Sequence, residues 1–156
     1  MSFFIDHELA HRLESADVAA HLDCVEASRN LDPTTGACHE PIAGGYAFFI
    51  GHNSPLSHAI GMGLNGPVIA EDVDELDRFY QGHGMPSHVE LCPMATPALL
   101  GLLNAQGYRP TNFTNMMVRG LNKETDSFPM TFDDFEVREA EPVEADLWIR
   151  VVTEGF

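Results

Sequence analysis

Residues 37–50 read ACHEPIAGGYAFFI, and this stretch limits the possible folds more than any other part of the chain. Two segments with strand character, 37–43 and 45–50, flank the Gly44-Gly45 pair, and the second segment is rich in aromatic residues. Paired glycines supply the positive backbone angles that a tight hairpin turn requires. The stretch therefore predicts an antiparallel β-hairpin.

Helices and short strands are predicted on both sides of this hairpin. Apolar residues recur every three or four positions over 6–30, which predicts a helix. The other predicted elements are strands at 57–64, 86–91, 111–121 and 135–140, and helices at 70–81, 97–106 and 141–153. This order predicts an α/β or α+β fold, in which helices flank a mixed, mostly antiparallel sheet.

Two helices have faces that the periodicity marks as buried. In the first helix the predicted stripe is Leu9, Leu13, Ala16, Ala20 and Cys24, widened by Val18, Leu22 and Val25. In the last helix the inward residues are Ala145, Trp148, Ile149 and Val152. An apolar face of this kind must be covered. We expect 135–156 to dock on the protein's own sheet or to exchange between two chains, giving a homodimer.

The chain is strongly acidic, with 24 Asp and Glu against 8 Lys and Arg among 156 residues, a formal charge of −16. Such a field repels phosphates, so we expect neither nucleic-acid nor membrane-surface binding. The sequence contains no apolar run of about 18 residues, and residues 1–5 lack the basic flank of a signal peptide. We therefore expect a cytoplasmic protein whose three scattered cysteines remain reduced.

Several short motifs carry a resemblance that covers most of the chain. They are GGYAFF at 44–49, SPL at 54–56, GMG at 61–63, GPV at 66–68 and ELCP at 90–93. Together with the element order, they resemble the amino-terminal half of a bacterial tandem N-acetyltransferase of the GNAT superfamily. Residues 137–146, VREAEPVEAD, are similar to the opening of a second GNAT domain. The resemblance implies a GNAT-like domain at 1–121, a linker at 122–134 and a truncated second unit at 135–156.

The family transfers an acetyl group from acetyl-CoA to an amine, and two of its features are altered here. Its Gln/Arg-x-x-Gly-x-Gly/Ala loop, which holds the diphosphate, is matched only by HAIGMG at 58–63, with Gly66 beyond it. The family's tyrosine acid corresponds to Leu103. The resemblance implies acetyl-CoA contacts at Gly61, Gly63 and Gly66. We nevertheless expect an inactive or accessory half without bound cofactor, with an amine or a second GNAT half as its partner. The alternative is a standalone acetyltransferase.

One predicted strand supplies further candidate site residues. His88, Glu90 and Cys92 alternate along one side of the segment that includes 86–91. The resemblance places the outer end of this strand at the ligand cleft. There Glu90 could deprotonate an amine or hold a cationic substrate, with His88 and Cys92 lining the cleft. The other interpretation is a half-exposed strand face with Cys92 packed in the core.

A metal-site pattern lies near the start of the chain, where residues 7–11 read HELAH. On a helix His7 and His11 share one face and could bind zinc, with Glu8 activating a water molecule. The third ligand would be His21 or Glu26. A zinc hydrolase is therefore a further alternative, and a solvated helix face is the competing interpretation of the same residues.

Overall fold

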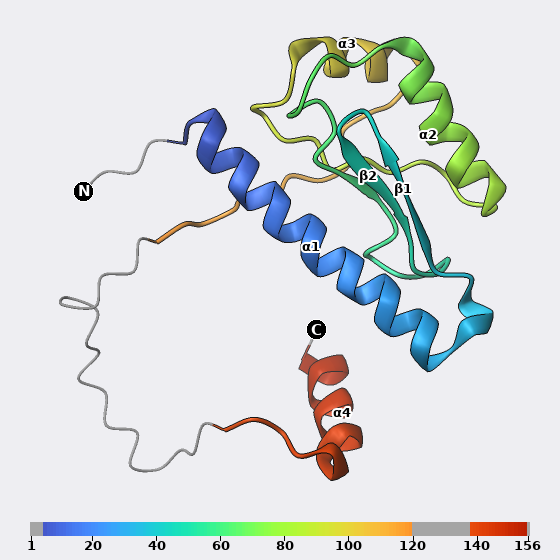
Figure 1. The fold of residues 1–156 in the computed structure, drawn as a ribbon, viewed down its shortest axis with the longest axis vertical. Coiled ribbons are helices and arrows are strands. Elements are labelled where there is room, and N and C mark those ends of the chain that lie inside the picture. Colours follow the sequence, from blue (N-terminus) through green and yellow to red (C-terminus); the bar gives the residue numbers. More distant parts are fainter. Residues whose placement is uncertain (1–4, 120–137, 156) are drawn as a thin grey trace. The chain divides into compact units, whose positions relative to one another are not determined.

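The computed structural model describes residues 5–119 and 138–155, and the chain divides into two compact units, Met1–Phe113 and Thr114–Phe156. The first unit contains α1 (His7–Leu31), η1 (Pro33–Thr35), β1 (Cys38–Ile42), β2 (Gly45–Phe49), β3 (Ala59–Ile60), α2 (Ala70–Gly82) and α3 (Pro97–Ala105) (Figure 1). The second contains η2 (Pro142–Glu144) and α4 (Ala145–Gly155). The predicted α+β class is confirmed.

The predicted hairpin is present, with its turn one residue earlier than expected. β1 and β2 pair antiparallel, and Ile42 pairs with Gly45, so Ala43 and Gly44 form the turn with φ values of 50° and 77°. β3 adds to the other side of β2 and gives the order β1-β2-β3. β3 is much shorter than the predicted strand at 57–64. Left-handed Gly61, with a φ of 77°, turns the chain out of the extended conformation directly after it.

The later predicted strands are reduced or absent in the described residues. The segment at 86–91 forms one parallel bridge, in which Val89 lies opposite Ala59. Two backbone hydrogen bonds hold it, from Ala59 N to His88 O at 2.9 Å and from Glu90 N to Ala59 O at 2.8 Å. The prediction of a strand at 111–121 is wrong over 111–119, and 138–140 is also irregular. Residues 120–121 and 135–137 of these predictions, and the predicted linker, lie outside the described residues.

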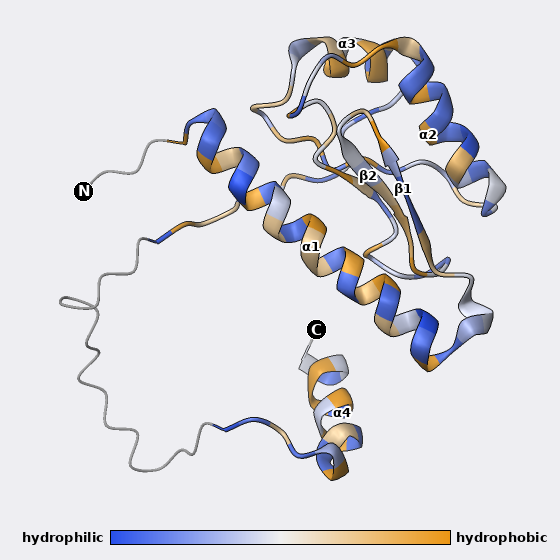
Figure 2. Cartoon of the chain, viewed as in Figure 1, coloured by the Kyte–Doolittle hydropathy of each residue, from blue (hydrophilic) through white to orange (hydrophobic). Residues whose placement is uncertain are grey.

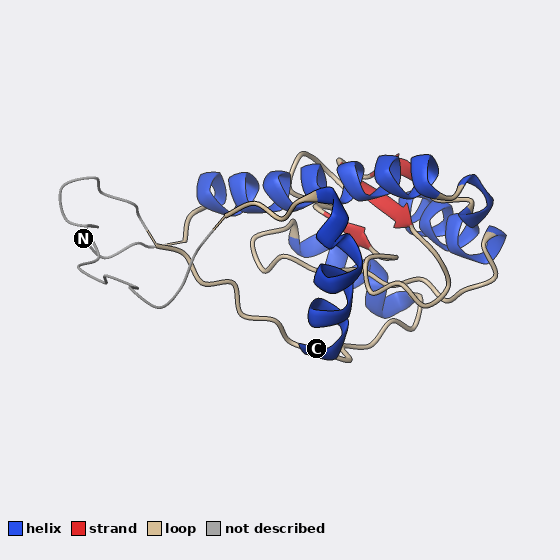
Figure 3. Cartoon of the chain, turned by 90° about the horizontal axis from the view of Figure 1, so that it is seen from below, coloured by secondary structure: helices blue, strands red, loops and turns tan. Residues whose placement is uncertain are grey.

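The sheet lies between α1 and the pair α2 and α3, and this arrangement follows from the alternation of its side chains (Figures 1 and 3). One core, on the α1 face, consists of Val25, Ala37, Phe48 and Ile60. The other, on the α2 and α3 face, includes Ala47, Ala59, Leu76, Tyr80 and Leu99. Consecutive residues within β2, and within β3, therefore point into opposite cores.

The buried face of α1 differs from the predicted stripe. Val25 is buried as predicted, and Val18 and Leu22 pack beside it. Ala16 and Ala20, however, are exposed, whereas Ala10 and His21 are buried and Glu14 is partly buried. The face that meets the sheet is therefore rotated by about one residue from the predicted one. Hydrophilic residues occur along the whole length of α1 (Figure 2). The buried face of α1 therefore includes the carboxyl group of Glu14 and the imidazole of His21.

The apolar face of α4 is exposed in the structure. Trp148 is 59 % exposed and Ile149 is 52 % exposed, and α4 has no buried residue. The predicted inward packing of Ala145, Trp148 and Ile149 is therefore not observed within the described residues. The docking and homodimer predictions for 135–156 stay predictions. No helix in the described parts of the chain is long and apolar enough to cross a membrane.

Candidate functional site

Polar side chains gather between α1 and the sheet, where the parallel bridge joins β3 to the segment around Val89. We call this group the α1 cluster; its members are Glu14, Asp17 and His21 from α1, His58 just before β3, and Glu90 and Cys92 beyond the bridge. Glu90 and Cys92 are two of the residues that the sequence marked as candidates. The cluster combines three carboxyl groups, two imidazoles and one thiol.

His58 is oriented by a backbone carbonyl. Its Nδ1 lies 2.9 Å from Pro55 O, and because a carbonyl oxygen only accepts, Nδ1 carries the hydrogen and donates. The other ring nitrogen, Nε2, is 3.3 Å from Glu90 Oε2. This nitrogen is buried and has no hydrogen-bond partner among the described residues, so the contact with Glu90 is a close approach of two side chains and not a hydrogen bond. The His58–Glu90 pair joins the segment before β3 to the segment after Val89.

His21 is also oriented through its Nδ1 atom, but no carboxylate lies close to its Nε2 atom among the described residues. Its Nδ1 lies 3.0 Å from Asp17 O and 3.2 Å from Asp17 Oδ1, so this nitrogen donates. The Nε2 atom is buried and has no hydrogen-bond partner within the described residues. The His21 ring meets His58 edge-on, with 5.1 Å between the ring centroids. The cluster thus contains a buried ring nitrogen without a hydrogen-bond partner in the described part of the chain.

Glu14 is a carboxylic acid of the cluster whose pKa is shifted. Burial raises its pKa above the ordinary value, while the Cys92 thiol and the Gly61 N–H favour the carboxylate and lower the pKa. The charges of Glu90 and Asp17 raise it further. The Glu14 Oε2 atom is buried and has no hydrogen-bond partner in the part of the chain that the structure describes. This carboxyl group therefore has an open position for a hydrogen-bond donor.

Replacing Glu14 by Gln should change how stability depends on pH. Because the pKa of Glu14 is higher in the folded than in the unfolded protein, folding favours the protonated carboxyl group. The contribution of Glu14 to stability is therefore complete below the unfolded-state pKa. It is lost as pH rises through the folded-state pKa. We expect Glu14→Gln to have a Tm a few degrees above that of the wild type at about pH 8, and a matching Tm near pH 4. Thermal unfolding across this range tests it. The control is Glu8→Gln on the exposed start of α1; an equal shift in both variants, or a pH-independent shift, would contradict the prediction.

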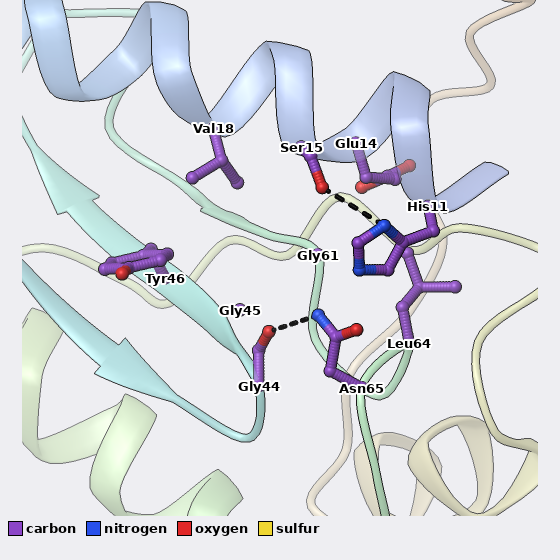
Figure 4. Close-up of a pocket in the computed structure, with 10 residues that line it drawn as sticks. All are labelled: His11, Glu14, Ser15, Val18, Gly44, Gly45, Tyr46, Gly61, Leu64 and Asn65. Atoms are coloured by element: carbon purple, nitrogen blue, oxygen red, sulfur yellow. Dashed lines mark hydrogen bonds between the residues drawn. The ribbon is translucent and has the colours of Figure 1, made fainter. Parts of the chain in front are cut away.

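A pocket of about 110 Å³ lies beside the cluster, and Glu14 belongs to both (Figure 4). We call it the α1 pocket; it is lined by His11, Glu14, Ser15 and Val18 of α1, Gly44, Gly45 and Tyr46 of the hairpin, and Gly61, Leu64 and Asn65 after β3. Ser15 and His11 are joined by a hydrogen bond of 3.4 Å. Asn65 Nδ2 donates to Gly44 O at 3.0 Å, which ties the segment after β3 to the hairpin turn.

The three glycines that the resemblance assigned to acetyl-CoA lie between β3 and α2, but their surroundings differ from a phosphate-binding loop. Gly63 N donates to Ala43 O at 3.0 Å, and the Gly61 N–H interacts with Glu14, so neither group is directed at a ligand. Gly66 is exposed, with a φ of 142°. α2 begins only at Ala70.

The N-terminus of α2 is acidic and closed. Glu71 and Asp72 lie in its first turn, and Asp72 Oδ2 accepts a hydrogen bond of 2.8 Å from Ile69 N. A helix N-terminus binds phosphate through free N–H groups and a positive local field. At the start of α2 the Asp72 carboxylate already accepts the Ile69 N–H, and Glu71 and Asp72 make the local charge negative. This end of α2 is therefore poorly suited to a diphosphate.

The remaining candidate residues are separated from the cluster or buried. His88 has an exposed side chain, whereas its backbone oxygen joins the parallel bridge. Leu103, which the resemblance matches to a tyrosine, is 4 % exposed and belongs to the core that includes Leu76 and Tyr80 of α2. His11 contacts Ser15, and His21 is held by Asp17. No group of three His, Cys, Asp or Glu side chains in the described ranges is arranged to hold a metal, so the HELAH zinc site is not supported.

Sequence reasoning found Glu90 and Cys92 but missed the residues that face them, Glu14 and His58. The available signal was helical spacing, because Ala10, Glu14 and His21 share one face of α1. No protein-family model, curated protein or solved structure matches the chain.

Proposed function

We propose that the unit Met1–Phe113 is a GNAT-like domain that does not transfer an acetyl group itself. Its role is to shape a substrate site or to brace a catalytic half. The element order supports this proposal: a long helix precedes an antiparallel meander, and a crossover helix then leads to a segment that pairs parallel with β3. The motifs at 44–68 and 90–93 support the same assignment.

The acidic N-terminus of α2 is the observation on which the absence of catalysis rests. A diphosphate at this end would meet the carboxylates of Glu71 and Asp72, and the Ile69 N–H is already bonded to Asp72. Unit charges of like sign repel by roughly 1 kcal/mol at 4 Å in bulk water and by more where water is excluded. With a net charge of −16, the chain adds a long-range penalty for any polyanion.

Titration of acetyl-CoA into the full chain tests this proposal. We expect no binding heat and no increase in Tm at about 1 mM ligand, because a ligand that prefers the folded state would raise the Tm. The double variant Glu71→Gln/Asp72→Asn removes both charges while keeping at position 72 a side-chain oxygen that can accept the hydrogen bond from Ile69 N. Binding by the variant alone would support the charge argument. Micromolar 1:1 binding by the wild type would contradict the proposal.

The second candidate is a standalone acetyltransferase, and the His58–Glu90 pair is the observation that favours it. Glu90 is 38 % exposed at its side chain, so an amine in solution can reach this proton acceptor. If the wild type binds acetyl-CoA and acetylates amines, Glu90→Gln should lower the rate by about 100-fold or more. An unchanged rate in this variant would exclude Glu90 as the base.

A further inference from the structure

A thiol and an imidazole meet where β1 begins and α2 ends, on the side of the sheet that α2 covers (Figure 1). The Cys38 Sγ atom lies 3.2 Å from the Nε2 atom of His83, the C-cap residue of α2. When Nδ1 carries the ring hydrogen, Nε2 is an acceptor and the S–H group donates to it. Both residues are partly exposed. The Cys38–His83 pair therefore places a proton acceptor beside a nucleophile.

Two aromatic rings hold the His83 imidazole in place. The Phe49 ring stacks on it, with 4.2 Å between the ring centroids and 12° between the planes. The Phe79 ring meets it edge-on, with 4.9 Å between the centroids. Phe49 is also the residue that pairs with Cys38 in the hairpin, so the register of β1 and β2 brings the ring and the thiol together. The contact between Nε2 and the sulfur is thus supported by packing on two sides of the ring.

The charges around the pair support transfer of the thiol proton to His83. Burial raises the pKa of the Cys38 thiol, the Arg29 guanidinium lowers it by stabilising the thiolate, and the charge of Glu40 raises it. The raised pKa keeps the resting group a thiol, which needs a base before it can react. His83 lies at the C-terminus of α2, where the partial negative charge of the helix favours a protonated imidazole. Both products of the transfer therefore have a stabilising neighbour.

The other two cysteines lack this arrangement. Cys24 and Cys92 are partly exposed, as Cys38 is, but neither is hydrogen-bonded to an imidazole in the described part of the chain. At Cys92 burial raises the pKa of the thiol, and the charge of Glu14 also raises it. A carboxylate beside a thiol disfavours the thiolate, which is the reactive form. Cys38 is therefore the thiol whose surroundings favour reaction.

We propose that Cys38 is a modification site at which hydrogen peroxide forms a sulfenic acid, with His83 as the base. His83 Nε2 takes the thiol proton while the sulfur attacks one oxygen of the peroxide. The S–O bond forms and the O–O bond breaks, and the leaving hydroxide takes the proton from His83 to become water. Sulfur is oxidised by two electrons and the peroxide is reduced by two. The inference stands apart from the proposed function, because it requires neither acetyl-CoA nor a catalytic half.

Treatment of the reduced full chain with hydrogen peroxide, with dimedone present to trap sulfenic acid, tests the proposal. Peptide mass spectrometry gives the labelling rate of all three cysteines in one sample. We expect Cys38 to be labelled roughly tenfold faster, or more, than Cys24 and Cys92. These two thiols are internal references because they are also partly exposed, and the comparison needs no variant. A rate at Cys38 equal to or below theirs overturns the proposal.

His83→Phe separates the base from the packing, because it keeps an aromatic ring against Phe49 and removes the proton acceptor. We expect the labelling rate of Cys38 to fall roughly tenfold or more, with the rates of the other two cysteines unchanged. The matched control is His52→Phe, which replaces the other imidazole that meets the Phe49 ring and should leave Cys38 labelling as in the wild type. Thermal unfolding shows whether both variants are folded. An unchanged Cys38 rate in His83→Phe, or an equal loss in both variants, contradicts the role of His83.

Discussion

Gly45→Ala is expected to destabilise the protein by about 3 kcal/mol or more, the largest effect of any substitution considered for this chain. The added Cβ would collide with Ile60 O and would lie 2.5 Å from Met62 N and 2.6 Å from Gly61 C. All three are backbone atoms of β3 and of the turn that follows, so no flexible side chain can move aside. The β2–β3 pairing and one wall of the α1 pocket would have to shift together.

Urea denaturation of the variant and the wild type measures this difference. The matched control is Gly101→Ala in α3, where an added Cβ meets no atom within 4 Å. Alanine in a helix interior is favoured over glycine by roughly 0.5–1 kcal/mol, so this control should be neutral or stabilising. If Gly45→Ala is destabilised by less than about 0.5 kcal/mol, β2 does not approach the turn after β3 this closely.

The helices and the hairpin could be predicted because their determinants are local. The apolar spacing of 6–30 and the first-turn acids of the helix predicted at 70–81 each act within a few residues, and the observed helices, His7–Leu31 and Ala70–Gly82, agree closely. The segments at 86–91 and 111–119 also have strand-like patterns. A strand, however, needs a neighbour to receive its hydrogen bonds, and local pattern does not supply one. The segment at 86–91 forms one bridge, to Ala59, whereas 111–119 forms none and all its residues are exposed.

The candidate site was half predictable for a related reason. Glu90 and Cys92 were marked by alternation along one segment, which is a local signal. Their partners come from α1 and from the turn before β3. On α1, periodicity correctly marked Val18, Leu22 and Val25 but did not mark the polar residues of the same face. Hydrophobicity alone does not mark Glu14 and His21 as buried, because both are polar. Only the tertiary packing places their side chains between α1 and the sheet, where each has a buried atom without a hydrogen-bond partner among the described residues.

Leu103→Tyr is the second substitution with a large expected effect, about 3 kcal/mol of lost stability. Leu103 is 4 % exposed and packs in the core with Leu76, Tyr80 and Leu99. A larger ring in a filled core costs about 1–3 kcal/mol, and a buried hydroxyl without a partner adds roughly 1–3 kcal/mol. Tyr80 shows what such a hydroxyl requires, because its OH donates to Phe48 O at 3.3 Å. Leu103→Met, which conserves volume, should cost less than about 1.5 kcal/mol.

An acetyl-transfer assay of Leu103→Tyr and Leu103→Met tests the reason proposed for the domain's inactivity. If the absence of a tyrosine at position 103 were the only obstacle to catalysis, Leu103→Tyr would transfer an acetyl group from acetyl-CoA to an amine. We expect no activity, because the side chain at this position faces the core and the acidic start of α2 disfavours the cofactor. A stable Leu103→Tyr variant with acetyltransferase activity would show that position 103 can reach a ligand. The inactivity would then trace to one residue rather than to the absence of a diphosphate site.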